Sequence, residues 1–396
     1  MARIGVYGGS FNPPHLGHVL AAQAAKSALG LDRVLVIPAA IPPHKALADG
    51  SPDADTRLHL TELAFSGLDG FAVSDLELRR QGASYTVDTL RELHERYPND
   101  TLVLLMGTDM LLSFDTWREP DTICRLAELG CFSRYENTEQ ALIDKKAELN
   151  ERFGAAVHLI ANDCFEISST EIRRLLLFGC AEGCLPAQVL SEIEATGLYG
   201  TGDDHRGLSY EELEHISLSL HKERRVAHVR GCVSLARTLA ERFGEDACLA
   251  SRAAVLHDVT KALTDRQQTA LCAAYGIELS EFDRSQPQLL HAITASAVAA
   301  RVFGETPAVC SAIRWHTTGR ADMTGLEKIL YIADLAEPTR DFPGVDAIRA
   351  ALQRDLDAGV RLGMEHTVRY LTERGCAVAP ESLEALASLK GRLNKN

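Results

Sequence analysis

Two histidines stand three residues apart in the glycine-rich segment 8–18, GGSFNPPHLGH. Glycines let a backbone approach a phosphate closely, and the amides at a helix N-terminus add positive potential. Imidazoles at this spacing at the start of a helix share one face and can point at the same phosphate. The segment matches neither the three-glycine dinucleotide fingerprint nor the Gly-Lys-Ser/Thr phosphate loop. We therefore predict phosphate chemistry at His15 and His18; the alternative is a capped turn with surface histidines.

A second phosphate-type segment is 167–173, ISSTEIR, which places hydroxyl groups before a helix and Arg173 one turn later. Ser168 and Glu171 also satisfy the pattern of an ordinary capping box. Capping and phosphate binding use the same backbone amides, so the two interpretations are compatible. Between the two segments, the loop 42–45 (PPHK) carries one stiffly held lysine, and 107–109 (GTD) is a turn with a carboxylate.

The elements that must position these residues alternate between short apolar runs and helical patterns, which predicts a doubly wound parallel α/β sheet. Ligands then bind at the carboxyl ends of the strands, where the segments above fall. The predicted strands are Ile4–Tyr7, Val34–Ile37, Phe71–Leu76, Leu102–Met106, Cys131–Arg134 and Val157–Ile160. The predicted helices between them include Val19–Leu29, Asp55–Ser66, Val87–Arg96 and Glu139–Arg152.

The second half of the chain carries metal-type side chains inside apolar helical patterns. They are His228, the pair His257 and Asp258, His291, His316 and Asp334. A buried unpaired carboxylate is costly, and metal coordination is one way to offset that cost. The alternative is a set of core histidines satisfied by hydrogen bonds and a capping or salt-bridged aspartate. The whole ordered set favours the metal site.

Helical spacing of apolar residues continues through this half and predicts an all-α domain. The predicted helices are Leu213–Leu220, Val226–Arg242, Asp246–His257, Asp265–Tyr275, His291–Phe303, Pro307–Trp315, Leu326–Ala336, Ala347–Leu362 and Leu383–Leu393. The glycine-rich, charged stretch 198–208 reads as an exposed connector. We place the boundary near residue 203, between domains at 1–200 and 209–396.

Composition narrows the function classes. The 396 residues carry a net charge of −14, which argues against nonspecific nucleic-acid binding. No apolar run approaches the ~20 residues of a membrane span, and the N-terminus enters a strand without a signal peptide. The ten cysteines form no Cys-x-x-Cys pair, so we expect reduced thiols in a cytoplasmic protein. The sequence leaves a homo-oligomer open.

The motifs of the first half resemble those of the nucleotidyltransferase superfamily, which has His-x-Gly-His and Ile-Ser-Ser-Thr-x-x-Arg signatures. Together with PPHK at 42–45, SYTVDT at 84–89, MGTD at 106–109 and the stretch 114–117, they are similar to bacterial nicotinate-nucleotide adenylyltransferases over about residues 3–199. That resemblance implies transfer of AMP from ATP to nicotinate mononucleotide, giving nicotinate adenine dinucleotide and pyrophosphate, with Mg²⁺. It also favours the nicotinate over the nicotinamide nucleotide.

The same resemblance implies a role for each matching residue. His15 and His18 contact the ATP phosphates, Ser169 and Arg173 hold the β- and γ-phosphates, and Lys45 holds the mononucleotide phosphate. The remaining substrate residues are Gly8, Ser10 and Phe11 at the nucleotide cleft, Gly107 and Asp109 at the ribose, and Thr86 and Trp117 at the nicotinate ring. Plain core packing is the alternative for the tryptophan.

The order His … His-Asp … Asp in the second half resembles the HD phosphohydrolase superfamily. The segments TK at 260–261, WHTTG at 315–319 and ADLAEPTR at 333–340 are similar to the YqeK family of symmetrical diadenosine tetraphosphate hydrolases, over about residues 210–390. The resemblance implies two ions, iron or manganese: one held by His228, His257, Asp258 and Asp334, and a second, bridged by Asp258, held by His291 and His316. Lys261 and Arg340 are candidate cations for the developing charge, although Lys261 also fits a solvated helix end.

The sequence therefore predicts a bifunctional enzyme whose ligands are ATP, nicotinate mononucleotide and diadenosine tetraphosphate, with neither a nucleic acid nor a membrane as partner. Two alternatives stay open for the helical half. It is a metal- or nucleotide-binding regulatory module without turnover, or a nucleotidase of different specificity.

Overall fold

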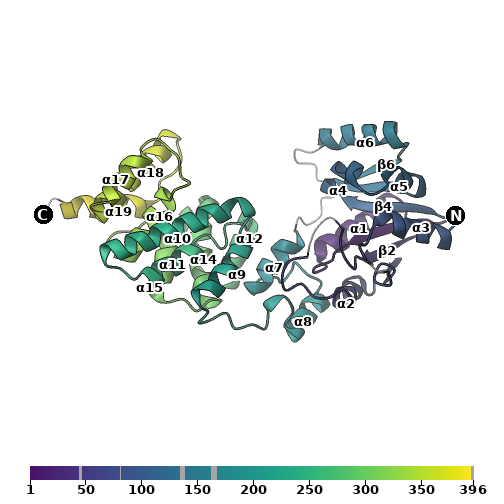
Figure 1. Ribbon diagram of the computed structural model, residues 1–396, viewed down its shortest axis with the longest axis horizontal. Coiled ribbons are helices and arrows are strands. Elements are labelled where there is room, and N and C mark those ends of the chain that lie inside the picture. Colours follow the sequence, from purple (N-terminus) through teal and green to yellow (C-terminus); the bar gives the residue numbers. More distant parts are fainter. Residues whose placement is uncertain (44–46, 81, 134–138, 162–166, 394–396) are drawn as a thin grey trace. The chain divides into compact units, whose positions relative to one another are not determined.

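The computed structural model describes residues 1–43, 47–80, 82–133, 139–161 and 167–393 (Figure 1). The chain divides into two compact units, Met1–Asp203 and Asp204–Asn396. Within the described ranges, no helix has the combined length and apolar character that crossing a membrane requires.

The first unit is built on a six-stranded sheet in the order β3-β2-β1-β4-β5-β6, with every neighbouring pair parallel. Its strands are β1 (Arg3–Gly9), β2 (Arg33–Pro38), β3 (Phe71–Val73), β4 (Thr101–Gly107), β5 (Glu128–Ser133) and β6 (Val157–Ala161). The strand order reverses between β1 and β4, where Tyr7 lies opposite Leu105. In a doubly wound sheet, ligands bind in the crevice beyond the carboxyl ends of the strands at this switch point.

Helices connect these strands and cover the sheet, which confirms the predicted α/β class. They are α1 (Leu16–Ala28), α2 (Ala54–Phe65), α3 (Thr86–Arg96), α4 (Thr108–Leu112), α5 (Pro120–Leu126), α6 (Glu139–Phe153), α7 (Ser169–Leu177) and α8 (Ala187–Thr196), with short 3₁₀ turns η1 (Phe114–Thr116) and η2 (Leu198–Gly200). The strand predicted to reach Leu76 ends at Val73, because the amides of Leu78 and Arg79 donate to the Asp75 carbonyl and fold the chain into a turn.

The second unit is all helical, as predicted. Its α-helices are α9 (Tyr210–Leu220), α10 (Glu223–Phe243), α11 (Ala247–Leu256), α12 (Asp265–Ala274), α13 (Glu281–Ser285), α14 (Leu290–Arg301), α15 (Pro307–Trp315), α16 (Gly325–Ala336), α17 (Val345–Leu352), α18 (Leu356–Glu373) and α19 (Pro380–Leu393), and η3 (Pro287–Leu289) is a 3₁₀ turn. Helix α16 packs against α10, α11, α15 and α18 and is buried along most of its length, so it is the central helix of the unit.

One predicted helix of this unit is wrong. Apolar spacing predicts one continuous helix over 347–362, but α17 ends at Leu352 and α18 begins at Leu356. The side chain of Asp355 accepts a hydrogen bond from the Ala358 amide at 3.2 Å and caps the new helix. A capping aspartate inside an apolar pattern is a local start signal that spacing alone does not weigh.

Candidate active sites

The two histidines of the first unit lie together where β1 leads into α1. His15 is the N-cap residue of α1, and its backbone N–H donates to His18 Nδ1 at 3.2 Å. The two rings stack with their centroids 3.6 Å apart. The edge of Phe11 lies against His18, with ring centroids 5.0 Å apart. The structure thus brings the pair onto one face at the carboxyl end of β1.

Burial lowers the pKa of His18 to about 3, so its ring is neutral at physiological pH. Because Nδ1 accepts the His15 amide, the ring proton of the neutral form is on Nε2. His18 is therefore a neutral hydrogen-bond donor, suited to an oxygen that gains negative charge.

The second signature segment is joined to the turn that precedes these histidines. Ser169 Oγ donates to the Pro13 carbonyl at 3.1 Å, and Arg173 Nη1 donates to the Asn12 carbonyl at 2.7 Å. Ser168 caps α7 in a capping box with Glu171, as its spacing allowed. The N-terminus of α7 and the start of α1 are thus neighbours although more than 150 residues separate Asn12 from Arg173.

Sequence reasoning missed Arg57, which joins two loops of this site. It is 1% exposed, and its guanidinium donates to the carbonyls of Ser10 and Ala39 at 2.8 Å each and of Ala40 at 3.0 Å. It therefore ties the loop after β1 to the loop after β2. The available signal was its position on the face of α2 that carries the buried residues Leu60 and Ala64.

The other expected residues of this unit have mixed surroundings. Gly8 and Gly107 are exposed at the ends of adjacent strands β1 and β4, and a Cβ at either would meet nothing within 4 Å. Phe11 is fully buried, and Trp117 packs beside Phe114 and against the core while staying partly exposed. Three further residues sit at strand or helix ends: Ser10 after β1, Thr86 opening α3 and Asp109 in α4. Lys45 lies outside the described residues.

The second unit directs four histidines at one carboxylate. At Asp258 Oδ2 lie His257 Nε2, 3.4 Å away, and His228 Nε2, 4.0 Å away. At Oδ1 lie His291 Nε2, 3.3 Å away, and His316 Nε2, 3.8 Å away. These residues come from α10, α14 and the ends of α11 and α15. Asp258 thus divides the histidines into two pairs, one at each oxygen.

Asp334 on α16 completes the first pair. Its Oδ1 lies 3.1 Å from His228 Nε2 and 3.9 Å from His257 Nε2. Sequence reasoning missed Cys232, a buried thiol one turn along α10, whose Sγ lies 3.6 Å from His228 Nε2. Its signal was the four-residue spacing from His228, which puts both on one helical face.

The opposite nitrogen of each histidine is anchored. Nδ1 of His257, His291 and His316 lies 2.7–2.8 Å from the carbonyls of Ala254, Gln288 and Ile313, each three residues earlier in its own chain segment. His228 Nδ1 lies 3.0 Å from Glu337 Oε1. A proton held on Nδ1 by such an acceptor leaves the lone pair on Nε2, the form that binds a metal.

Electrostatics agrees with this donor set. Burial lowers the pKa of His291 to about 3 and of His316 to about 4, so both rings are neutral. Burial opposes ionisation of Asp258, yet the surrounding histidines, His257 foremost, hold its pKa well below its usual range. The carboxylates of Asp258 and Asp334 in turn raise the pKa of His257 despite its burial. Two neutral imidazoles, His291 and His316, beside an ionised carboxylate are a donor set that fits a divalent cation.

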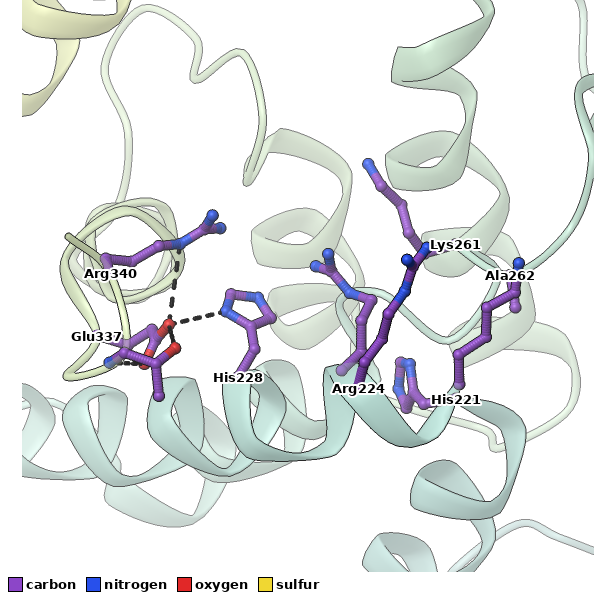
Figure 2. Close-up of a pocket in the computed structure, with 10 residues that line it drawn as sticks. His221, Arg224, His228, Lys261, Ala262, Glu337 and Arg340 are labelled. Atoms are coloured by element: carbon purple, nitrogen blue, oxygen red, sulfur yellow. Dashed lines mark hydrogen bonds and ion pairs between the residues drawn. The ribbon is translucent and has the colours of Figure 1, made fainter. Parts of the chain in front are cut away.

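A cavity of about 460 Å³ opens beside this cluster (Figure 2). Five cationic side chains line it: Lys222, Arg224, Arg225, Lys261 and Arg340. Figure 2 shows Arg340 and Glu337 on one side of His228, and Arg224 and Lys261 on the other. The Glu337 carboxylate is engaged by His228 and Thr339, so the cavity presents net positive charge. It suits a polyanion.

Three of these cations contact candidate ligands directly: Arg225 at Asp258, Arg340 at Asp334 and Lys261 at His291. Arg340 donates from Nη2 to Asp334 Oδ1 at 2.7 Å and from Nε to the Asp334 carbonyl at 2.9 Å. The Lys261 ammonium lies 3.1 Å from His291 Nε2, although the residue is exposed overall. Lys261 lies in the turn between α11 and α12 rather than at a helix end, and its ammonium is at the cluster.

Two family models match the chain: a cytidylyltransferase-like model at residues 6–175 and an HD domain model at residues 225–338. A probable nicotinate-nucleotide adenylyltransferase of Gloeobacter violaceus is 42% identical over 202 residues, covering 50% of this chain and 96% of that protein. One of Exiguobacterium sibiricum is 38% identical over 200 residues, covering 50% of this chain and 100% of that protein.

Two solved structures resemble one half of the chain each. The first, described as a predicted HD superfamily hydrolase involved in NAD metabolism from Clostridium acetobutylicum, is 33% identical, covers 47% of this chain and 98% of its own, and has a TM-score of 0.45. The second is a Plasmodium falciparum nicotinic acid mononucleotide adenylyltransferase complexed with NaAD. It is 18% identical, covers 51% of this chain and 99% of its own, and has a TM-score of 0.43. Because the Gloeobacter violaceus protein is 42% identical over 96% of its length, the chain belongs to the nicotinate-nucleotide adenylyltransferase family through its first half, which is joined to an HD domain in the second.

Proposed function

We propose that the first unit transfers AMP from ATP to nicotinate mononucleotide, giving nicotinate adenine dinucleotide and pyrophosphate. One observation carries the proposal: the hydrogen bonds from Ser169 and Arg173 to the Pro13 and Asn12 carbonyls hold the N-terminus of α7 beside the stacked histidines. The two relatives described as probable nicotinate-nucleotide adenylyltransferases, 42% and 38% identical, support the substrate assignment.

The reaction is an in-line substitution at the α-phosphorus of ATP. A phosphate oxygen of the mononucleotide forms the new P–O bond, and the bond to pyrophosphate breaks. The chain positions the reactants and stabilises charge rather than forming covalent bonds. His18 Nε2–H and His15 would donate to the phosphates that gain charge, and Ser169, Arg173 and the free amides of α7 would hold the leaving pyrophosphate. Mg²⁺ supplies further charge neutralisation when bound with the nucleotide.

The remaining expected residues are assigned to ATP and to the acceptor. The exposed glycines Gly8 and Gly107 would leave room for ATP along the ends of β1 and β4, and Asp109 would contact its ribose. Thr86 and the partly exposed face of Trp117 would meet the nicotinate ring. Lys45 is assigned to the mononucleotide phosphate on its motif.

We further propose that the HD unit hydrolyses diadenosine tetraphosphate symmetrically to ADP in the cytoplasm. The carrying observation is the division of four histidine Nε2 atoms between the two oxygens of Asp258. His228, His257, Asp258 and Asp334 would hold one cation, with His291 and His316 holding the other against the same carboxylate. Such a pair, iron or manganese, would supply Lewis acidity that lowers the pKa of a bound water and neutralises phosphoryl charge. Lys261 and Arg340 would bind the polyphosphate and stabilise its developing charge.

The same division of the histidines between the two oxygens of Asp258 also fits a hydrolase of another polyphosphorylated nucleotide. The cavity is lined mainly by cations, which recognise phosphates and say little about the bases. The products separate the candidates: ADP alone from diadenosine tetraphosphate supports symmetrical cleavage, whereas AMP with ATP points to another specificity. Metal-dependent nucleotide binding without turnover would indicate a regulatory module.

The test compares two variants of the full chain. His18→Asn is expected to lower dinucleotide synthesis at least a hundredfold and to leave hydrolysis unchanged, because it removes a donor expected at the transition state. Asp258→Asn is expected to abolish hydrolysis, because it removes the negative charge shared by both histidine pairs, and to spare synthesis. Loss of both activities in either folded variant contradicts two independent sites.

A further inference from the structure

Arg225 contacts an atom that the proposed metal centre needs. Its Nη2 donates to Asp258 Oδ2, the oxygen faced by His257 Nε2 at 3.4 Å and His228 Nε2 at 4.0 Å. The Asp258 side chain is 2% exposed, so little water is available to reduce the attraction between guanidinium and carboxylate. Two positively charged groups therefore compete for this oxygen: the guanidinium, and a cation bound by the two histidines.

The attachment of Arg225 differs from that of Arg340, the other arginine at the cluster. Arg340 donates both to Asp334 Oδ1 and to the Asp334 backbone carbonyl, at 2.7 Å and 2.9 Å. The second bond anchors Arg340 whatever happens to the carboxylate. The buried Nε of Arg225 has no hydrogen-bond partner among the described residues, and the hydrogen bond of its guanidinium there is the one to Asp258. Arg225 is thus the more easily displaced of the two.

We propose that Arg225 is an exchangeable counter-ion, which competes with the first cation for Asp258 Oδ2 and, once displaced, binds phosphate in the adjoining cavity. The cavity already includes Arg225 in its wall, with Lys222 and Arg224 next to it on the chain. A guanidinium and a divalent cation at one oxygen repel each other strongly in a buried site. Rotation of the side chain into the cavity relieves this repulsion and presents a planar donor fork to a phosphate.

Two consequences follow, and both rest on the metal centre proposed above. Cation binding must displace Arg225 from Asp258, and this costs free energy. The arginine therefore lowers the affinity for the cation. Phosphate binding then takes the displaced guanidinium as a partner, so cation and phosphate each strengthen the binding of the other by the same factor. Arg225 acts here as a positioning and substrate-binding residue rather than as a metal ligand.

The first test measures the Mn²⁺ affinity of the full chain by electron paramagnetic resonance of the free ion, in chloride buffer without phosphate. Arg225→Gln is expected to bind the tightest Mn²⁺ ion about tenfold more strongly than the unsubstituted chain. The matched control is Arg224→Gln, which removes the same charge from the same cavity at a residue that makes no ion pair with a candidate ligand within the described ranges. It is expected to change the affinity less than twofold. Arg225→Lys, which keeps the charge, is expected to fall between the chain and Arg225→Gln.

Equal Mn²⁺ affinity in Arg225→Gln and Arg224→Gln, with both variants folded by circular dichroism, overturns the competition. If the unsubstituted chain itself binds no Mn²⁺ tightly, the metal centre of the proposed function fails, which is a distinct result.

The second test measures binding of inorganic phosphate by calorimetry, with Mn²⁺ and with chelator. The ratio of the two affinities is expected to fall about tenfold in Arg225→Gln and to stay near its original value in Arg224→Gln. An unchanged ratio in Arg225→Gln removes the phosphate-binding half of the proposal.

Discussion

At the scale of single residues, both sites depend on which ring nitrogen of a histidine carries the proton. In the first unit, His18 accepts at Nδ1 from the His15 amide and so presents Nε2–H as a donor. In the second, Nδ1 of His257, His291 and His316 lies against a backbone carbonyl, and Nε2 presents a lone pair. One type of side chain thus presents a donor for the proposed phosphate binding in one unit and a lone pair for the proposed metal binding in the other, and the neighbouring backbone atom makes the difference.

The state of His18 gives a pH prediction. Its pKa falls from the ordinary 6.5 to about 3 through burial, so the folded chain does not take up a proton there between pH 8 and pH 5. The unfolded chain does take it up below 6.5, so the stability of the first unit at neutral pH is lost progressively as the pH falls from 6.5 toward 3. Imidazole proton NMR from pH 8 to 5, assigned with His18→Gln, should show no titration of the His18 signal. A midpoint near 6.5 would contradict the buried neutral ring.

At the scale of elements, the sites lie where separate loops or helices are fastened together. Arg57 of α2 binds three carbonyls in the loops that follow β1 and β2. Arg173 of α7 likewise donates a hydrogen bond to a carbonyl in the loop before α1. In the HD unit, α16 carries Asp334 through the centre of the helical packing. These hydrogen bonds and helix contacts fix the geometry of the sites, because loops without them would move relative to one another.

Removal of the Arg57 guanidinium tests the first of these fastenings. Arg57→Met keeps the aliphatic stem and leaves the Ser10, Ala39 and Ala40 carbonyls without that donor. We expect a loss of about 3 kcal/mol in the stability of the first unit, because buried acceptors without partners cost roughly 1–3 kcal/mol each and some will find water. Synthesis should fall at least tenfold while hydrolysis stays unchanged.

The control for Arg57 is Arg79→Gln, at an exposed arginine paired with Asp75, where a change within about 0.5 kcal/mol is expected. Thermal unfolding of both variants, followed by calorimetry, measures the effect. A first-unit transition in Arg57→Met that coincides with that of Arg79→Gln would show that the carbonyl contacts carry no stability.

The elements also show how far sequence reasoning reached. Apolar runs such as Val34–Ile37 identified strands of the parallel sheet, since strands buried on both faces must be apolar throughout. The six metal-type residues were recognisable by their chemistry inside apolar helices. The role of Arg57 was not recognisable, because its partners are carbonyls of distant loops that spacing does not reveal. The helix start at Asp355 was not predicted for a different reason: its side chain caps α18, although the apolar pattern continues across this position.

At the scale of the whole chain, the distribution of charge contrasts with its sum. The net charge is −14, yet five cations line the cavity of the HD unit beside the histidine cluster. A negative surface repels polyanions in general, whereas a small cationic cavity selects those that fit. Both units are proposed to act on phosphoanhydrides of adenosine, which gives their presence on one chain a chemical rationale.

We expect the first unit to make, at a low rate, a side product that the second removes. If the terminal phosphate of a second ATP replaces the mononucleotide as attacker, its oxygen bonds to the α-phosphorus, pyrophosphate leaves, and the product is diadenosine tetraphosphate. Asp258→Asn chain incubated with ATP and Mg²⁺ should accumulate this compound over hours, because the hydrolase that consumes it is disabled. The double variant with His18→Asn should not. Chromatography of the nucleotides measures the product in both variants. An Asp258→Asn chain that accumulates no dinucleoside polyphosphate would show that the first unit does not make the compound that the second is proposed to hydrolyse.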